Sequence, residues 1–277
     1  MDYNKIILGM KRFGSTEQDI CKHGLRVTLE NIKENVVIAP WWEPSSLPKL
    51  GKAELMNPSD SGDTKVWNIK GENIDMTFVK TGIGAPCFLE GLLTLGVTQC
   101  KRIIFIGSAG SLDAGIGIGD IVIPEYSICG DGASRYIASD DLSHDVFGEK
   151  VYPDSSMFET AITETSRICE KTNVKWHVGR AFSTDSITAQ FAHIDTFLAM
   201  GCNAIEMETA SAFRAAKLMG IPLVALLSIS DNTVTNKSLV SGRTTEENEY
   251  RWRVRHELFP EIILSIFHIF GGHVNDE

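Results

Sequence analysis

The sequence predicts an α/β fold, because short apolar runs alternate with runs of helical periodicity from residue 36 onward, with Gly or Pro between them. Strands that alternate with helices indicate a largely parallel sheet that is covered on both faces. The chain has 277 residues, of which 43% are hydrophobic, so it can bury a sizeable core. No change of composition marks a linker. We therefore expect one domain over residues 36–277, preceded by an N-terminal arm or helix over residues 1–35.

The expected strands are short and are either apolar or alternate with polar residues. They are Val36–Pro40, Ile74–Phe78, Ile103–Ile106, Ile121–Pro124, Trp176–Phe182, Ala204–Glu206 and Leu223–Ile229. Helical patterns cover Phe88–Leu93, Met157–Glu170, Thr209–Met219 and Glu246–Phe270, the last interrupted by Pro260. Residues 41–63 are rich in Pro, Ser, Gly and Asp and are expected to form a loop. Within the arm, Ser15–Gln18 has the pattern of a helix capping box.

The charge of the chain disfavours nucleic acid as a partner. Its formal net charge is −10, and Lys or Arg runs longer than two residues do not occur. No apolar run reaches the ~20 residues of a membrane span. The apolar stretch near residue 1 is too short for a signal peptide, so we expect a cytoplasmic protein. The cysteines and histidines show neither CxxC nor HExxH spacing. We expect no metal and no cofactor.

Three strand ends carry glycine-rich or polar residues, and ligands in open α/β sheets bind beyond the carboxyl ends of the strands. These ends are Gly82–Gly84, Gly107–Gly110 and Ser230-Asp231. The glycine-rich turns could offer N–H groups to an anion or a sugar hydroxyl, or could need glycine for steric reasons alone. Neither turn completes G-x-G-x-x-G, which argues against a dinucleotide site.

Two acidic positions are poor core material. In Ile205-Glu206-Met207-Glu208, Glu208 could accept hydrogen bonds from a vicinal diol while Met207 packs on a sugar ring. Helix-entry chemistry is the alternative for this glutamate. Asp231 follows an apolar strand, where it could donate a proton or merely cap the next segment.

These motifs occur in an order that resembles the nucleoside phosphorylase family, which includes purine nucleoside phosphorylases, uridine phosphorylases and methylthioadenosine nucleosidases. The runs that carry the resemblance are Gly82–Gly84, Phe105–Leu112, Gly119–Pro124, Ala204–Ala210 and Ile229–Asn232. The resemblance implies a three-layer α/β/α sandwich with a mixed, partly barrel-like central sheet. It also implies cleavage of the bond between a ribose and its base.

The resemblance also implies roles for single residues. Glu208 would hold the ribose hydroxyls, Met207 would lie beneath the sugar, and Asp231 would protonate the leaving purine. The expected base contacts are Ser230, Ile205, Ile187 and Gln190. Phosphate or water is expected beside Gly84, Gly107 and Ser108. Asp131–Tyr136 is a milder match to a stretch of the uridine phosphorylases.

The chain departs from the family where phosphate is normally held by arginines, which bind phosphate bidentately. Phe105 occupies one of these positions, the turn Pro40–Ser46 contains no arginine, and a third position falls near Asp60. Glu43 lies where the nucleosidases carry the glutamate that activates water. The nucleosidases also carry an arginine four residues before the acid at Asp231, and this position is Leu227 here.

We therefore expect an enzyme that cleaves a nucleoside, with a purine favoured over uridine. The products would be free base and ribose 1-phosphate, or ribose if water attacks, and phosphate would be a co-substrate rather than a cofactor. A non-catalytic nucleoside-binding relative is the second hypothesis. Arg243 could replace a missing arginine. By resemblance we expect a homodimer or homohexamer, with His23 a candidate to reach a neighbouring site.

Overall fold

The computed structural model describes residues 1–57, 62–71 and 74–271, and all described strands belong to one mixed sheet. The strands are β1 (Asn35–Ala39), β2 (Lys52–Leu55), β3 (Lys65–Lys70), β4 (Asp75–Lys80), β5 (Arg102–Ser111), β6 (Ile121–Gly130), β7 (Lys150–Val151), β8 (Trp176–Thr184), β9 (Ala204–Glu206) and β10 (Leu223–Asn232). The helices are α1 (Tyr3–Arg12), α2 (Glu17–Gly24), α3 (Ala85–Leu95), α4 (Arg135–Ala138), α5 (Ser155–Thr172), α6 (Ile194–Ala199), α7 (Thr209–Met219), α8 (Thr245–Arg253) and α9 (Phe259–Gly271).

The sheet closes on itself at β10. This strand pairs parallel to β5 and antiparallel to β6, so β10-β6-β8-β9-β5 forms a closed, barrel-like unit. The remaining order β1-β4-β3-β2 extends the sheet from the other edge of β5. The structure thus confirms the predicted mixed and partly barrel-like sheet.

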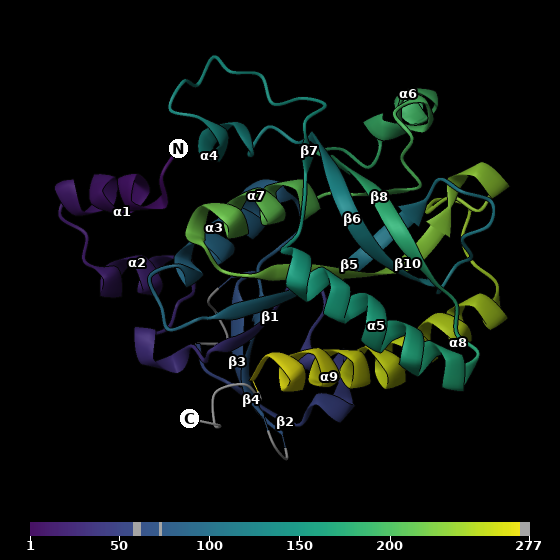
Figure 1. Ribbon diagram of the computed structural model, residues 1–277, viewed down its shortest axis with the longest axis horizontal. Helices are drawn as coiled ribbons and strands as arrows, with labels where there is room; N and C mark the ends of the chain where they lie inside the picture. The colour runs from purple at the N-terminus through teal and green to yellow at the C-terminus, as the bar shows by residue number, and fades with distance from the viewer. Residues whose placement is uncertain (58–61, 72–73, 272–277) are drawn as a thin grey trace.

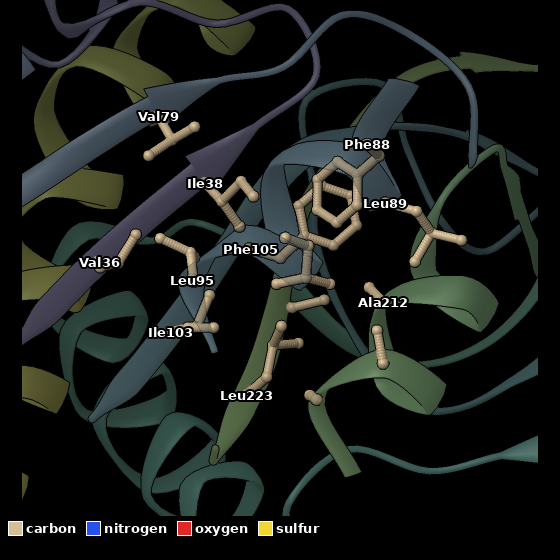
Figure 2. Close-up of a cluster of buried hydrophobic side chains, with 14 of the residues drawn as sticks. Val36, Ile38, Val79, Phe88, Leu89, Leu95, Ile103, Phe105, Ala212 and Leu223 are labelled. Atoms are coloured by element: carbon tan, nitrogen blue, oxygen red, sulfur yellow. The ribbon is translucent and has the colours of Figure 1, made fainter. Parts of the chain in front are cut away.

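Helices cover both faces of this sheet (Figure 1). The side of α3 and α7 holds a cluster that includes Val36, Ile38, Phe88, Phe105 and other side chains of the inner strands (Figure 2). On the opposite side, α5 and α9 pack against each other and share a second buried cluster with the sheet. Two separate apolar clusters, one on each face, are the signature of a three-layer sandwich.

The N-terminal residues form α1 and α2, which pack on α3 and α7 (Figure 1). Tyr3 and Ile7 are buried there, and the Tyr3 hydroxyl donates to the Leu93 carbonyl at 2.6 Å. The capping box lies one residue later than predicted: Thr16 and Asp19 cap each other's backbone N–H groups. The shift places the N-cap at Thr16, directly before the first residue of α2.

The predicted loop over residues 41–63 is wrong in part, because it contains β2. All four residues of β2 are exposed, and the polar-apolar alternation of Lys-Ala-Glu-Leu is too short to mark a strand in the sequence. It is held by backbone pairing with β3, as an edge strand can be. The long C-terminal helical pattern is divided as expected near Pro260, into α8, a π-helical turn at Val254–Leu258, and α9.

Phe105 is fully buried in β5, and its ring lies 4.6 Å from that of Phe88. We expect Phe105→Ala to lower the free energy of unfolding by about 3–5 kcal/mol, because the core cannot refill the cavity. The same truncation at Phe13, which is 84% exposed, should change it by less than about 0.5 kcal/mol. Urea denaturation of both variants measures the difference, and equal losses would contradict this packing.

Candidate active site

A cavity of ≈ 360 Å³ lies at the carboxyl ends of β1, β5, β9 and β10. Most of the predicted site residues line it, although they come from distant parts of the sequence. The lining comprises Pro40, Trp41, Trp42, Ile83, Gly107, Ser108, Ala109, Gly110, Ile187, Gln190, Ile205, Glu206, Met207, Glu208, Ser230, Asp231, Leu239, Arg243 and Arg251. The structure therefore brings the three predicted strand ends together.

A β-bulge in β10 explains why two consecutive side chains, Ser230 and Asp231, face this cavity. The register with β5 shifts between Ile229 and Asp231, and Asp231 then pairs with Gly110. A side chain at Gly110 would approach the Asp231 carboxylate to 3.1 Å, so glycine leaves it room. Ser230 Oγ lies 2.5 Å from Asp231 Oδ1 and 3.1 Å from the Ala109 carbonyl.

Glu208 is fixed at the meeting point of two helices. It precedes α7, and its Oε1 accepts a hydrogen bond of 2.6 Å from the N–H of Gly84, the residue before α3. A helix N-terminus favours a negative charge. Burial, and next the charge of Glu206, nevertheless raise the pKa of Glu208 to about 8. The Gly84 N–H, predicted to hold phosphate or water, is thus already bound to this glutamate.

Glu206 anchors the strand-to-helix junction rather than offering a free carboxylate. Its Oε2 accepts from the N–H groups of Glu208 and Thr209, at 2.6 and 2.7 Å. Its Oε1 accepts from the hydroxyls of Ser183 and Thr209, at 2.5 and 2.6 Å. Burial raises the pKa of Glu206, and these hydrogen bonds oppose that rise. The network fixes Glu208 and Met207 in place beside the cavity.

The apolar part of the cavity could hold a flat base and a sugar ring. Ile205 and Ile187 line it together with Met207, as predicted for base and sugar contacts. Gln190 is 8% exposed and also lines the cavity. Trp41 and Trp42 add aromatic surface that the sequence analysis did not assign to the site. Their position directly after β1, at a strand end, was the available signal.

Ser108 and Gly107 line the cavity where the resemblance places phosphate or water, and the Ser108 side chain is exposed. The cationic lining residues are Arg243 and Arg251. Arg243 lies on the segment before α8, and its Nε donates to the Ser230 carbonyl. Arg251 lies on α8 itself. The sequence analysis missed Arg251 because nothing in a charged helical pattern distinguishes a cavity-facing arginine from a solvent-facing one.

Other predicted residues lie elsewhere. Glu43 is absent from the cavity lining and pairs with Lys80 at 2.7 Å, in a neighbouring hollow beside Trp41. This places the predicted water-activating base outside the site. His23 is exposed on α2, and the position near Asp60 lies outside the described residues. Asp131 accepts a hydrogen bond from the Ser134 N–H and is likewise not part of the lining.

Within the described residues, no group of three or more His, Cys, Asp or Glu side chains could hold a metal ion. The six cysteines are all free thiols. No helix in the described ranges is long and apolar enough to span a membrane.

A family model described as the phosphorylase superfamily matches residues 45–264, and the chain belongs to this superfamily of nucleoside phosphorylases and nucleosidases. The chain is 26% identical over 171 residues to a guanosine phosphorylase of Halorubrum lacusprofundi, covering 61% of this chain and 66% of that protein. It is 24% identical over 211 residues to a uridine phosphorylase of Thermococcus kodakarensis, covering 70% and 72%. The match thus spans less than two thirds of the Halorubrum relative's length.

Solved structures share the fold at low sequence identity. A uridine phosphorylase from Vibrio fischeri superposes with a TM-score of 0.68 at 20% identity, over 86% of this chain and 92% of that one. A purine nucleoside phosphorylase from Toxoplasma gondii in complex with immucillin-H gives 0.69 at 15% identity, over 90% and 96%. An AMP nucleosidase from Bacteroides thetaiotaomicron gives 0.66 at 16% identity, over 94% and 100%.

The raised pKa of Glu208 predicts how stability depends on pH. Between its ordinary value of 4.5 and about 8, the folded protein keeps a proton that the unfolded chain releases, so stability should fall as pH rises. Glu208→Gln removes this group and should flatten that fall, while Glu206 maintains part of it in the same direction. Urea unfolding from pH 5 to pH 8.5 measures both slopes. Parallel curves for the two proteins would contradict the assignment.

Proposed function

We propose that the protein cleaves the N-glycosidic bond of nucleosides, with purine nucleosides favoured. The observation that carries this proposal is that Glu208 and Asp231 line one partly apolar cavity, although they come from different strand ends. One carboxylate can grip a vicinal diol, and the other can serve the leaving base. The family to which the chain belongs and its purine and guanosine phosphorylase relatives support the same reaction class.

In the proposed reaction the bond to the base lengthens first, which leaves an oxocarbenium-like ribosyl group. Asp231 gives its proton to N7 of the departing purine. Ser230 suits this step, because its hydroxyl donates to Asp231 Oδ1 and can stabilise the carboxylate that remains when the proton has left. Phosphate or water then captures C1′ from the side of Ser108. Glu208 and Met207 fix the sugar, which is a proximity effect.

Two other readings have specific support. Gln190, buried in the cavity lining, suits hydrogen bonding to uracil and favours a uridine enzyme. Phe105 is buried where a phosphate arginine stands in related enzymes, which favours hydrolysis or a non-catalytic binding protein. Asp231 argues against both uridine specificity and an idle site, because a proton donor serves a leaving purine.

Release of free base from inosine, adenosine, methylthioadenosine and uridine, each with and without phosphate, tests the proposal. We expect purine bases to be released faster than uracil. Dependence of the rate on phosphate identifies the nucleophile. Absence of any released base under all conditions would overturn the enzyme assignment in favour of nucleoside binding, which calorimetry with the same nucleosides would detect.

We expect Asp231→Asn to lower kcat on purine nucleosides about 10²- to 10⁴-fold with little change in KM, because the amide cannot deliver a proton. Asp113→Asn provides the matched control: Asp113 accepts a hydrogen bond from Gly115 in an exposed loop outside the cavity lining. Steady-state kinetics on inosine compare the variants. An unchanged kcat for Asp231→Asn would remove this residue from the reaction.

A further inference from the structure

We propose that Arg251 and Arg243 bind a phosphate group in this cavity, in place of the arginines that β1 and β5 lack. This inference rests on the proposed function, because it takes the cavity to be the nucleoside site. The ligand chemistry is a tetrahedral dianion. It could arrive as inorganic phosphate, the attacking co-substrate, or as the phosphate ester of a nucleotide substrate.

Arg251 has unused binding capacity. It lines the cavity, and its buried Nε has no hydrogen-bond partner among the described residues. Nor does it form an ion pair with a carboxylate within residues 1–57, 62–71 and 74–271. A half-buried guanidinium without a partner is costly, and a bidentate oxyanion would satisfy it.

The electrostatic surroundings of Arg251 favour an anion. Burial, and then the positive charges of Arg243 and Arg255, lower the pKa of Arg251 to about 10, while Asp231 partly offsets them. Arg251 stays protonated at neutral pH despite this repulsion. Asp231, Glu206 and Glu208 are the acidic lining residues, and Glu206 already receives donors at both of its oxygens. A bound dianion would neutralise the arginine cluster directly.

Arg243 supplies the second cationic group. Its Nε is bound to the Ser230 carbonyl, which leaves its terminal nitrogens available to a ligand. That carbonyl belongs to the residue before Asp231, so Arg243 is anchored beside the proton donor. The exposed hydroxyl of Ser108 lines the same cavity and provides a neutral donor. Two guanidinium groups and a hydroxyl form a donor set suited to phosphate.

The helix that carries Arg251 is fixed by contacts outside the cavity. The Tyr250 hydroxyl donates to Asp120 Oδ1 at 3.3 Å, and Asp120 also contacts His177 at 2.8 Å. The Tyr250 ring lies so close to Gly119 that a Cβ there would stand 2.4 Å from it, and the Arg251 stem is the next neighbour. Gly119 has a φ of 93°, which also favours glycine. This close approach seats Arg251 against the β5–β6 turn.

Arg255 is a further arginine of this C-terminal segment that faces the turn after β1. It lies one helical turn after Arg251 and stands over the Trp42 ring, with 5.5 Å between guanidinium and ring centroid. Trp42 in turn packs on Phe259 at the start of α9, with 5.2 Å between the rings. The turn after β1 therefore supplies tryptophans, and the arginines that face them come from the C-terminal helices.

Calorimetric titration with inorganic phosphate tests the inference on the wild-type protein and on Arg251→Gln, Arg243→Gln and Arg12→Gln. Arg12 is exposed on α1 and is not part of the cavity lining, so its variant removes an equal charge away from the site. We expect the dissociation constant for phosphate to rise about tenfold or more for Arg251→Gln and Arg243→Gln, because charged hydrogen bonds are lost, and to stay unchanged for Arg12→Gln. Thermal melting checks the fold of each variant, and Arg251→Lys, with an intermediate loss, replaces Arg251→Gln if that variant unfolds.

Parallel titrations with adenosine and AMP distinguish the two sources of phosphate. Tighter binding of AMP than of adenosine, lost on Arg251→Gln, would support the inference with a nucleotide as ligand. A phosphate affinity that is equal in wild type and Arg251→Gln would overturn the inference. A wild-type protein that cleaves nucleosides, binds no phosphate and binds AMP no more tightly than adenosine would also overturn it. Phosphate binding through Arg251 without any base release would instead overturn the proposed function alone.

Discussion

The double pairing of β10, parallel to β5 and antiparallel to β6, is the constraint on which the site depends. It closes the barrel-like unit and fixes the carboxyl ends of β5, β9 and β10 around one cavity. The bulge at Ser230 occurs within this pairing, so that Ser230 and Asp231 both face the ligand side. A regular strand would have sent one of these two side chains to the opposite face.

Burial sets the chemistry of the acidic residues around this frame. Glu206 accepts four hydrogen bonds, which fix the start of α7. Glu208 accepts one hydrogen bond, from the Gly84 N–H, and lines the cavity. Neighbouring carboxylates therefore differ in task because they differ in donors. The raised pKa of Glu208 reflects water exclusion, which also strengthens any hydrogen bond that a sugar hydroxyl would make to it.

The positive charge that lines the cavity comes from two arginines, Arg243 and Arg251. Phe105 of β5 lies in the core, in contact with Phe88. The turn after β1 offers Trp41 and Trp42 instead of an arginine, and Glu43 there is held by Lys80 outside the cavity. Of the two cations beside the cavity, Arg243 lies on the segment before α8 and Arg251 lies on α8 itself. The carboxyl ends of the strands therefore define the cavity, and the C-terminal segment supplies its cationic lining.

The sequence by itself predicted the α/β class and the strands of the barrel-like unit, because periodicity is a local pattern. It also singled out Glu208 and Asp231, whose roles stay predictions. It did not reveal β2, because this exposed strand of four residues is too short to show a clear pattern and is held by backbone pairing with β3. Only the tertiary structure decided that the Gly84 N–H serves Glu208, a contact across 124 residues. Only it decided that Arg251 faces the cavity and Glu43 does not. Such contacts join distant segments, so no local pattern records them.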